Sequence, residues 1–240
     1  MNILIAIIML NLLIGVHELG HFLAAKASKV GVDEFSLGMG PKIFSKDFKG
    51  TTYSLRWILI GGYVRLNEDG YLKAKWWKQA IILFAGVIFN FVFAVIGTWI
   101  YIWLSDAINV GFFATLSLGI QLSISMVQQI FIAVMDIFKT VDTSAFAGPV
   151  GVVETISSFV NNGLINAVEI FTILNINLFV MNLLPIPMLD GGQIVLILIK
   201  RIFNKSEMPK FETVWNCIGL AILGFILFMA LKNDIVRLLF

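Results

Sequence analysis

Long apolar stretches recur along this 240-residue sequence, and they limit its fold more than any other feature. Hydrophobic residues make up 59% of the chain and charged residues only 13%, which is outside the usual range of soluble domains. Several stretches are long enough to cross the roughly 30 Å hydrocarbon core of a bilayer as helices. Because backbone polar groups in lipid must be satisfied internally, the sequence predicts an α-helical polytopic membrane protein.

The pattern of apolar runs and turn residues predicts about four transmembrane helices in a single domain, 1–240. After the first helix, β-branched and aromatic residues alternate with glycines, which favours a small membrane-associated β-hairpin sheet. The expected elements are a first span at about 2–27, the hairpin region at about 30–66, a second span at about 80–104, an amphipathic helical region on the outer side at about 111–165, a third span at about 167–199 that is broken at 185–192, and a fourth span at about 211–231.

The distribution of charge predicts the orientation of these spans. Between Lys26 and Lys78 there are ten basic and five acidic residues, whereas between Ser105 and Ile170 one base stands against five acids. The positive-inside rule therefore places the first segment in the cytoplasm and the second outside, with both termini outside. No pattern of basic and aromatic residues in the sequence suggests nucleic-acid binding. Within the second span, Asn90 is strongly polar and is expected to hydrogen-bond across helices.

The first apolar run contains the sequence His-Glu-Leu-Gly-His at residues 17–21. His17 and His21 are the two histidines of the chain, and on a helix residues four apart lie on one face. They can bind one metal ion, with Glu18 beside them as a general base. Ionisable groups at membrane depth are costly to desolvate, which makes a functional site the first hypothesis. The alternative is that both histidines are core residues satisfied by other polar groups.

A third protein ligand must be a carboxylate or, much less readily, Cys217, because no other histidine is present. Asp190 lies within the segment 185–192, where two prolines and two glycines interrupt the third span. An opened helix in a membrane is tolerated where it lines a cavity. His17, His21 and Asp190 would form a three-ligand zinc site with one position left for water. The alternative for Asp190 is a helix cap.

Four segments together resemble the site-2 protease family of intramembrane zinc metalloproteases, in particular its bacterial RseP-like branch. They are the motif at 17–21, Phe-Ser-Leu-Gly-Met-Gly-Pro at 35–41, Gly-Gly-Tyr-Val at 61–64, and the segment 182–191 with its Leu-Asp-Gly ending. The resemblance covers nearly the whole chain. It departs from that branch in the short stretch between the second span and the next apolar run, which leaves no room for the usual PDZ domain or domains.

The resemblance implies a catalytic zinc held by His17, His21 and Asp190, with Glu18 as the catalytic base. It also implies substrate-binding positions at Asn177, Asn182, Gly38 and Gly40. In the family, the hairpin region is a membrane-re-entrant element thought to pair with an unwound substrate strand, a form of edge-strand recognition.

We therefore predict a zinc metalloendopeptidase that hydrolyses peptide bonds in or near transmembrane segments, as a multi-pass protein of the bacterial inner membrane. Its expected partners are a transmembrane protein or peptide substrate and membrane lipid, and not nucleic acid. Anti-sigma factors and remnant signal peptides are both substrates of the kind that the family allows. Two alternatives stay open at this point. One is a metallohydrolase acting on a lipid or prenyl-type substrate, and the other is a zinc-binding membrane scaffold or transporter without hydrolase activity.

Overall fold

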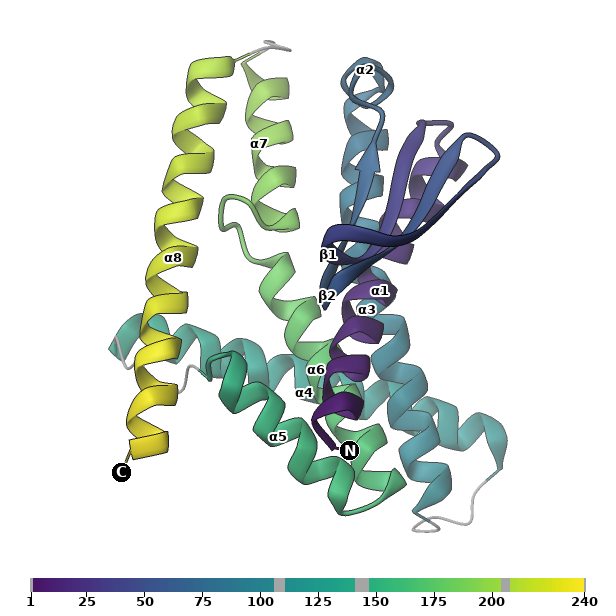
Figure 1. The fold of residues 1–240 in the computed structure, drawn as a ribbon, viewed down its shortest axis with the longest axis vertical. Coiled ribbons are helices and arrows are strands. Elements are labelled where there is room, and N and C mark those ends of the chain that lie inside the picture. The colour runs from purple at the N-terminus through teal and green to yellow at the C-terminus, as the bar shows by residue number, and fades with distance from the viewer. Residues whose placement is uncertain (1, 106–110, 141–146, 204–207, 240) are drawn as a thin grey trace. The chain divides into compact units, whose positions relative to one another are not determined.

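The computed structural model describes residues 2–105, 111–140, 147–203 and 208–239, which form eight helices and two strands (Figure 1). In chain order the elements are α1 (Asn2–Ala27), β1 (Val32–Phe48), β2 (Thr51–Leu66), α2 (Glu68–Lys73), α3 (Trp76–Leu104), α4 (Phe112–Thr140), α5 (Pro149–Asn161), α6 (Leu164–Leu183), α7 (Asp190–Ile202) and α8 (Pro209–Leu239). The predicted helices, the sheet after the first helix and the break in the third span are all present. The short α2 was not expected. The segment too short for a PDZ domain falls mostly on 106–110, outside the described residues.

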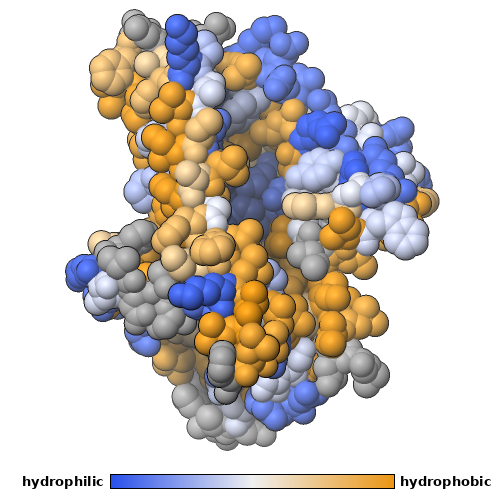
Figure 2. All heavy atoms as spheres, turned by 60° about the vertical axis from the view of Figure 1, so that its left-hand side comes forward, coloured by the Kyte–Doolittle hydropathy of each residue, from blue (hydrophilic) through white to orange (hydrophobic). Residues whose placement is uncertain are grey.

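Five of these helices are long and apolar enough to cross a membrane: α1, α3, α4, α6 and α8. Hydrophobic side chains cover much of the surface that Figure 2 presents, as expected where lipid replaces water as the solvent. The helix beyond the four expected is α4, which the sequence placed on the outer side as an amphipathic segment. Its residues 112–137 meet the same criteria of length and composition as the other four.

The chain divides into two compact units, which we describe separately. Unit A comprises residues 7–90 and 181–212, and unit B comprises residues 1–6, 91–180 and 213–240. Unit A contains the sheet, most of α1, the first half of α3 and all of α7. Every predicted site residue except Asn177 belongs to unit A.

The sheet of unit A consists of two long antiparallel strands that bend, so that one strand pairs along both of its edges (Figure 1). Phe35 of β1 is in register with Val64 on one side and with Tyr53 on the other, both in β2. The bends lie at glycines with a positive φ, Gly38 at 86° in β1 and Gly61 at 108° in β2. A residue with a Cβ atom is strained in this conformation, which explains the glycines at these bends.

Helices α1 and α3 pack closely within unit A because glycines remove side chains from their contact. A Cβ atom on Gly20 of α1 would lie 2.4 Å from the backbone oxygen of Ala85 in α3. Unit A also contains a buried apolar cluster, which consists of Ala25, Val30, Val32 and Ile82. The cluster joins α1, the start of β1 and α3, and it holds the residues 17–21 against α3.

Unit B has its own packing. Ala94 of α3 packs with Ile176 and Val180 of α6, and side chains of α4 cover this cluster. Asp234 of α8 is buried with 3% exposure, and its carboxylate accepts hydrogen bonds from backbone N–H groups at the start of α5. The first amides of a helix have no partner within the helix, so this carboxylate serves as the cap of α5.

Candidate metal centre

Three side chains from two helices of unit A converge on one point. His17 Nε2 lies 3.1 Å from Asp190 Oδ2, and His21 Nε2 lies 3.4 Å from the same oxygen. The two Nε2 atoms are 3.1 Å apart. All three candidate ligand atoms lie within 4.8 Å of one another, so they could hold one metal ion. The structure therefore brings together the three residues that the sequence singled out as metal ligands.

The other ring nitrogen of each histidine is engaged by an acceptor on α3. His17 Nδ1 lies 2.7 Å from Asn90 Oδ1, and His21 Nδ1 lies 2.8 Å from the carbonyl oxygen of Ile82. A carbonyl oxygen only accepts, so the proton of each neutral imidazole resides on Nδ1, and the lone pair resides on Nε2. This arrangement is typical of metal-binding histidines, whose second nitrogen donates to an outer acceptor.

The donor set fits a zinc ion on this geometry. Two imidazole nitrogens and a carboxylate oxygen face one another, and the buried Asp190 Oδ2 has no hydrogen-bond partner among the residues that the structure describes. Three acceptor atoms in contact repel one another electrostatically, and a bound cation would remove this repulsion. Nitrogen and oxygen ligands in this number are those of catalytic zinc sites, which use three protein ligands and keep one position open.

Glycines on two elements provide the space for this convergence. A Cβ atom on Gly86 of α3 would lie 2.4 Å from the His21 ring and 3.0 Å from Cε1 of His17. In α7, a Cβ atom on Gly192 would lie 2.0 Å from the carbonyl oxygen of Ile186. The loop before α7 thus folds back tightly on the helix start, and this places Asp190 at the first position of α7.

A cavity of about 360 Å³ is lined by the three candidate ligands and by Glu18. The Glu18 carboxylate accepts a hydrogen bond from the backbone N–H of Val64 in β2. The remaining lining comes from β2, α3 and the chain around the break: Tyr63, Val64, Leu66, Ile82, Leu83, Asn182 and Met188. A candidate general base therefore shares one partly enclosed space with the candidate ligands and a strand of the sheet.

The predicted substrate-binding residues are distributed over different places. Asn182 lines the cavity. Gly38 and Gly40 instead lie at the bend of β1, where both have a positive φ. Asn177 is half-buried on α6 and belongs to unit B. Their roles in binding substrate stay predictions.

Sequence reasoning identified Asn90 only as a residue that hydrogen-bonds across helices, and it did not identify Gly86 at all. Asn90 does bond across helices, and its partner is the candidate ligand His17. The signal available in the sequence was the spacing of Gly86 and Asn90, four residues apart and so on one face of α3.

Outside the spans, burial together with the negative charge of Asp190 raises the pKa of Tyr71 to about 12.

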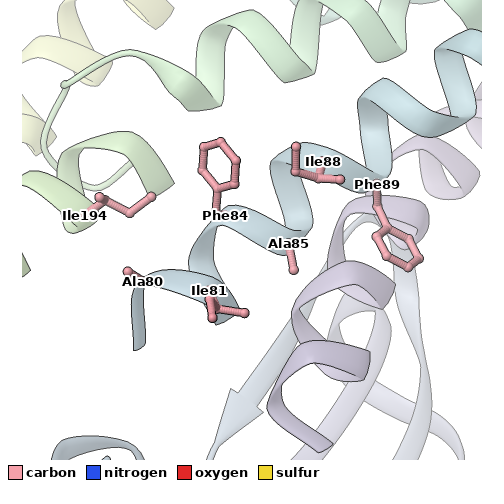
Figure 3. A pocket seen from close by; sticks show the side chains of 7 residues that line it. All are labelled: Ala80, Ile81, Phe84, Ala85, Ile88, Phe89 and Ile194. Carbon is pink, nitrogen blue, oxygen red and sulfur yellow. The ribbon is translucent and has the colours of Figure 1, made fainter. Parts of the chain in front are cut away.

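A second cavity of unit A, about 390 Å³ in volume, is apolar throughout (Figure 3). Its lining comes from one face of α3 and from a single residue of α7: Ala80, Ile81, Phe84, Ala85, Ile88, Phe89 and Ile194. None of these side chains can bind a metal or transfer a proton. Of these two cavities, the one around His17 and Asp190 contains the groups that could carry out hydrolytic chemistry.

Comparison with known proteins decides the family. The family model described as peptidase family M50 matches residues 5–226, most of the chain. The chain belongs to peptidase family M50. As a member of this family it is a zinc-dependent metalloendopeptidase of the site-2 protease type. With its five apolar helices it is a multi-pass integral membrane protein.

Several bacterial relatives, all provisionally named zinc metalloproteases, are similar over nearly the full chain. A protein of Fusobacterium nucleatum is 28% identical, with 99% of each chain covered. One of Clostridium acetobutylicum is 26% identical over 98% of this chain and 97% of the relative. A protein of Vibrio cholerae is 37% identical over a shorter part, 41% of this chain and 25% of its own length. The Fusobacterium alignment runs over 338 positions, so that relative contains a substantial stretch without a counterpart here.

Proposed function

We propose that this metalloendopeptidase cleaves peptide bonds in or near the transmembrane segments of other membrane proteins, with His17, His21 and Asp190 as zinc ligands and Glu18 as the catalytic base. The observation that carries the proposal is the convergence of three candidate ligand atoms beside Glu18 within a chain of family M50. Within the described part of the chain, the Glu18 carboxylate accepts a hydrogen bond from the Val64 amide and lies among the charged groups of the site.

The chemistry divides between the metal and the chain. Zinc bound at this cluster would supply a Lewis acid that acidifies water and polarises a peptide carbonyl. Glu18 would take a proton from the attacking water and then donate it to the leaving amine, which is general base followed by general acid catalysis. Asn90 and the Ile82 carbonyl keep the histidine protons on Nδ1, so that both Nε2 atoms stay available.

The substrate must be extended at the cleaved bond, because a helix hides its carbonyl groups in hydrogen bonds between residues i and i+4. Residues 62–66 of β2 pair with 32–37 of β1 along one edge and border the cavity with Tyr63, Val64 and Leu66. An extended peptide adding to the other edge would lie beside Glu18. Asn182 would hydrogen-bond its backbone, and the resemblance assigns Asn177, Gly38 and Gly40 to the same task.

The finer assignments rest on the resemblance and on the charge distribution. We propose a single protease domain in the bacterial inner membrane, with the basic segment 26–78 in the cytoplasm and both termini outside. Membrane-bound anti-sigma factors and remnant signal peptides are the substrate classes to test first. Both are single spans that a protease must unwind locally before it can cut them.

The test compares wild-type protein with Glu18→Gln in lipid nanodiscs. The probe is a designed single-span protein with a Leu/Ala span of about 20 residues, interrupted by Gly-Pro in the middle. We expect Glu18→Gln to keep its zinc and to lower kcat by about 10²–10⁴-fold, the usual contribution of a general base. Glu68→Gln, an exposed carboxylate on α2, is the matched control and should cleave normally. Full activity of Glu18→Gln would remove Glu18 from the mechanism.

The alternative of a lipid or prenyl-type substrate predicts a different outcome in the same assay. Such a substrate needs no strand partner, so disrupting the bend of β1 with Gly38→Val would leave its turnover intact. The proposed protease would lose cleavage of the single-span probe, because a Cβ atom at Gly38 would lie 2.8 Å from the Ile58 oxygen.

A further inference from the structure

Arg56 of β2 connects distant parts of the sheet through its guanidinium group. Its Nη2 atom lies 2.8 Å from Glu34 Oε1 and 2.6 Å from the hydroxyl oxygen of Tyr63, while its Nε atom lies 3.0 Å from Ser36 Oγ. The side chain is only 15% exposed, and the guanidinium also lies over the Tyr63 ring, 5.3 Å from the ring centre. Its Nη1 atom also donates to the carbonyl oxygen of Gly40, so one side chain contacts β1 at three residues and the cavity-lining Tyr63 at one.

Glu34 provides a fixed charge for this network. It is 5% exposed, and its Oε1 atom also lies 2.6 Å from Ser54 Oγ and 3.3 Å from Lys42 Nζ. Burial alone would raise its pKa, but hydrogen bonds from Ser54, Arg56, Tyr63 and Lys42 outweigh it and lower the pKa to about 2. Glu34 therefore remains a carboxylate at neutral pH and anchors Arg56.

Tyr63 is the point at which this network reaches the metal site. It lies in the segment 62–66, which borders the cavity and begins just after the bend at Gly61. In the part of the chain that the structure describes, this segment pairs with β1 along one edge only. The hydroxyl of Tyr63 bonds to Arg56 and Glu34, so the orientation of its ring in the cavity depends on Arg56.

We propose that Arg56 is a positioning residue for substrate: through Tyr63 it holds the free edge of residues 62–66 in place to receive an extended peptide. This inference rests on the proposed function, in which that edge pairs with substrate. Arg56 does not line the cavity, so its effect falls on binding and not on the proton transfers at Glu18. Lysine cannot replace it, because one ammonium lacks the planar fork that reaches several acceptors at once.

The test measures KM and kcat separately for the single-span Leu/Ala probe with its Gly-Pro interruption. We expect Arg56→Gln to raise KM about tenfold, the size of one lost hydrogen bond to a charged group. Its kcat should stay within about twofold of wild type, and its zinc content should not change. Arg56→Lys should recover only part of the loss. Lys49→Gln is the matched control, because Lys49 also lies over an aromatic ring, that of Phe48 at 5.3 Å, but is exposed in the turn between β1 and β2.

A double-mutant cycle shows whether Arg56 acts through Tyr63. Tyr63→Phe keeps the ring and removes the hydroxyl, so Arg56→Gln should add little to its effect on KM. Additive effects, an unchanged KM in Arg56→Gln, or an equal rise in KM for Lys49→Gln would each overturn the proposal. A loss of zinc or of kcat in Arg56→Gln would also overturn it, since that indicates a structural role.

Failure of the proposed function gives a different result. If the wild-type protein does not cleave the probe, the protease assignment for single-span substrates fails. Binding of the same probe to Glu18→Gln protein, measured with and without Arg56→Gln, then tests Arg56 without any turnover. A weaker affinity with Arg56→Gln supports the positioning role, and an equal affinity rejects it.

Discussion

His17 Nε2 lies 3.1 Å from Asp190 Oδ2, although the two residues come from different helices that are far apart in the sequence. With a neutral imidazole both atoms are acceptors, because the His17 proton then resides on the nitrogen that faces Asn90. Two acceptors at this distance indicate a place for a cation. The pair therefore connects the motif in α1 with the broken segment before α7 in a single candidate metal centre.

Asp190→Asn is expected to remove most of the zinc affinity. The amide is isosteric but neutral, so it fills the same space without the charge that favours a divalent cation. Loss of an outer-shell partner costs about 10–100-fold in metal affinity, and a direct ligand should cost more than that. Metal content after dialysis against a graded series of chelator concentrations measures the change. Asp136→Asn, an exposed carboxylate paired with Lys139, should bind zinc like wild type. Equal zinc content in both variants would exclude Asp190 as a ligand.

Asn90→Ala is expected to weaken zinc binding by about 10–100-fold, the usual effect of removing an outer-shell hydrogen bond. Without the 2.7 Å contact to Asn90, the His17 ring loses the acceptor that fixes its tautomer. Competition with a fluorescent zinc chelator gives the dissociation constant. Asn67→Ala serves as the control: this residue caps α2 with its side chain, so its loss costs about 0.5–2 kcal/mol of local stability but should leave zinc binding unchanged.

Gly86→Ala is expected to disrupt the metal centre through one methyl group. The new Cβ atom would lie 2.4 Å from the His21 ring, so the imidazole or α3 must move. Zinc affinity and kcat should fall together. Gly224→Ala offers a matched control in α8, where a Cβ atom meets nothing within 4 Å. Because alanine is the better helix former by about 1 kcal/mol, that variant should be as stable as wild type or more so. Similar zinc binding by both variants would contradict the role of Gly86.

The stability of the protein should fall in acid partly through Glu34. The pKa of Glu34 is lowered from its ordinary value of 4.5 to about 2, so the folded state binds a proton less readily than the unfolded state. Its stabilising contribution is therefore complete above about pH 5 and is lost as the pH falls toward 2. Glu34→Gln should lower the Tm in detergent at pH 7, and the difference from wild type should shrink steadily between pH 5 and pH 2. A difference that is constant with pH would show that the charge of Glu34 contributes nothing.

Asp234→Ala is expected to destabilise unit B without affecting zinc. The carboxylate accepts the N–H groups of Gly148 and Val150, both at 3.0 Å, and that of Gly151 at 3.2 Å. Loss of a helix cap costs about 0.5–2 kcal/mol, and three amides lose their acceptor here. Thermal unfolding in detergent, followed by circular dichroism, measures the change. The Asp234→Asn variant should lose less stability, because its amide oxygen still accepts hydrogen bonds from these N–H groups. An equal loss of stability in Asp234→Ala and Asp234→Asn would indicate that the charge of Asp234 matters and not its role as an acceptor.

Local patterns in the sequence were enough to predict most of the elements and the candidate ligands, but not α2 or the length of α4 as a fifth apolar helix. A spacing of four residues places His17 and His21 on one helix face wherever that helix lies, and the length of the apolar runs requires helices. The absence of a third histidine from the chain and the broken helix around residues 185–192 pointed to Asp190. These inferences depend on covalent spacing and on the cost of unpaired backbone in lipid, which are properties of the chain itself.

Only the tertiary structure decided which atoms meet. Asn90 could have bonded to any neighbouring helix, and its contact with His17 follows from the close approach of α1 and α3 at Gly20. The same approach explains Gly86, whose missing side chain has no signal in hydropathy. The double pairing of β1 and the reach of Arg56 to Tyr63 also depend on how two strands bend. Such contacts depend on distances between segments remote in sequence, which packing alone determines.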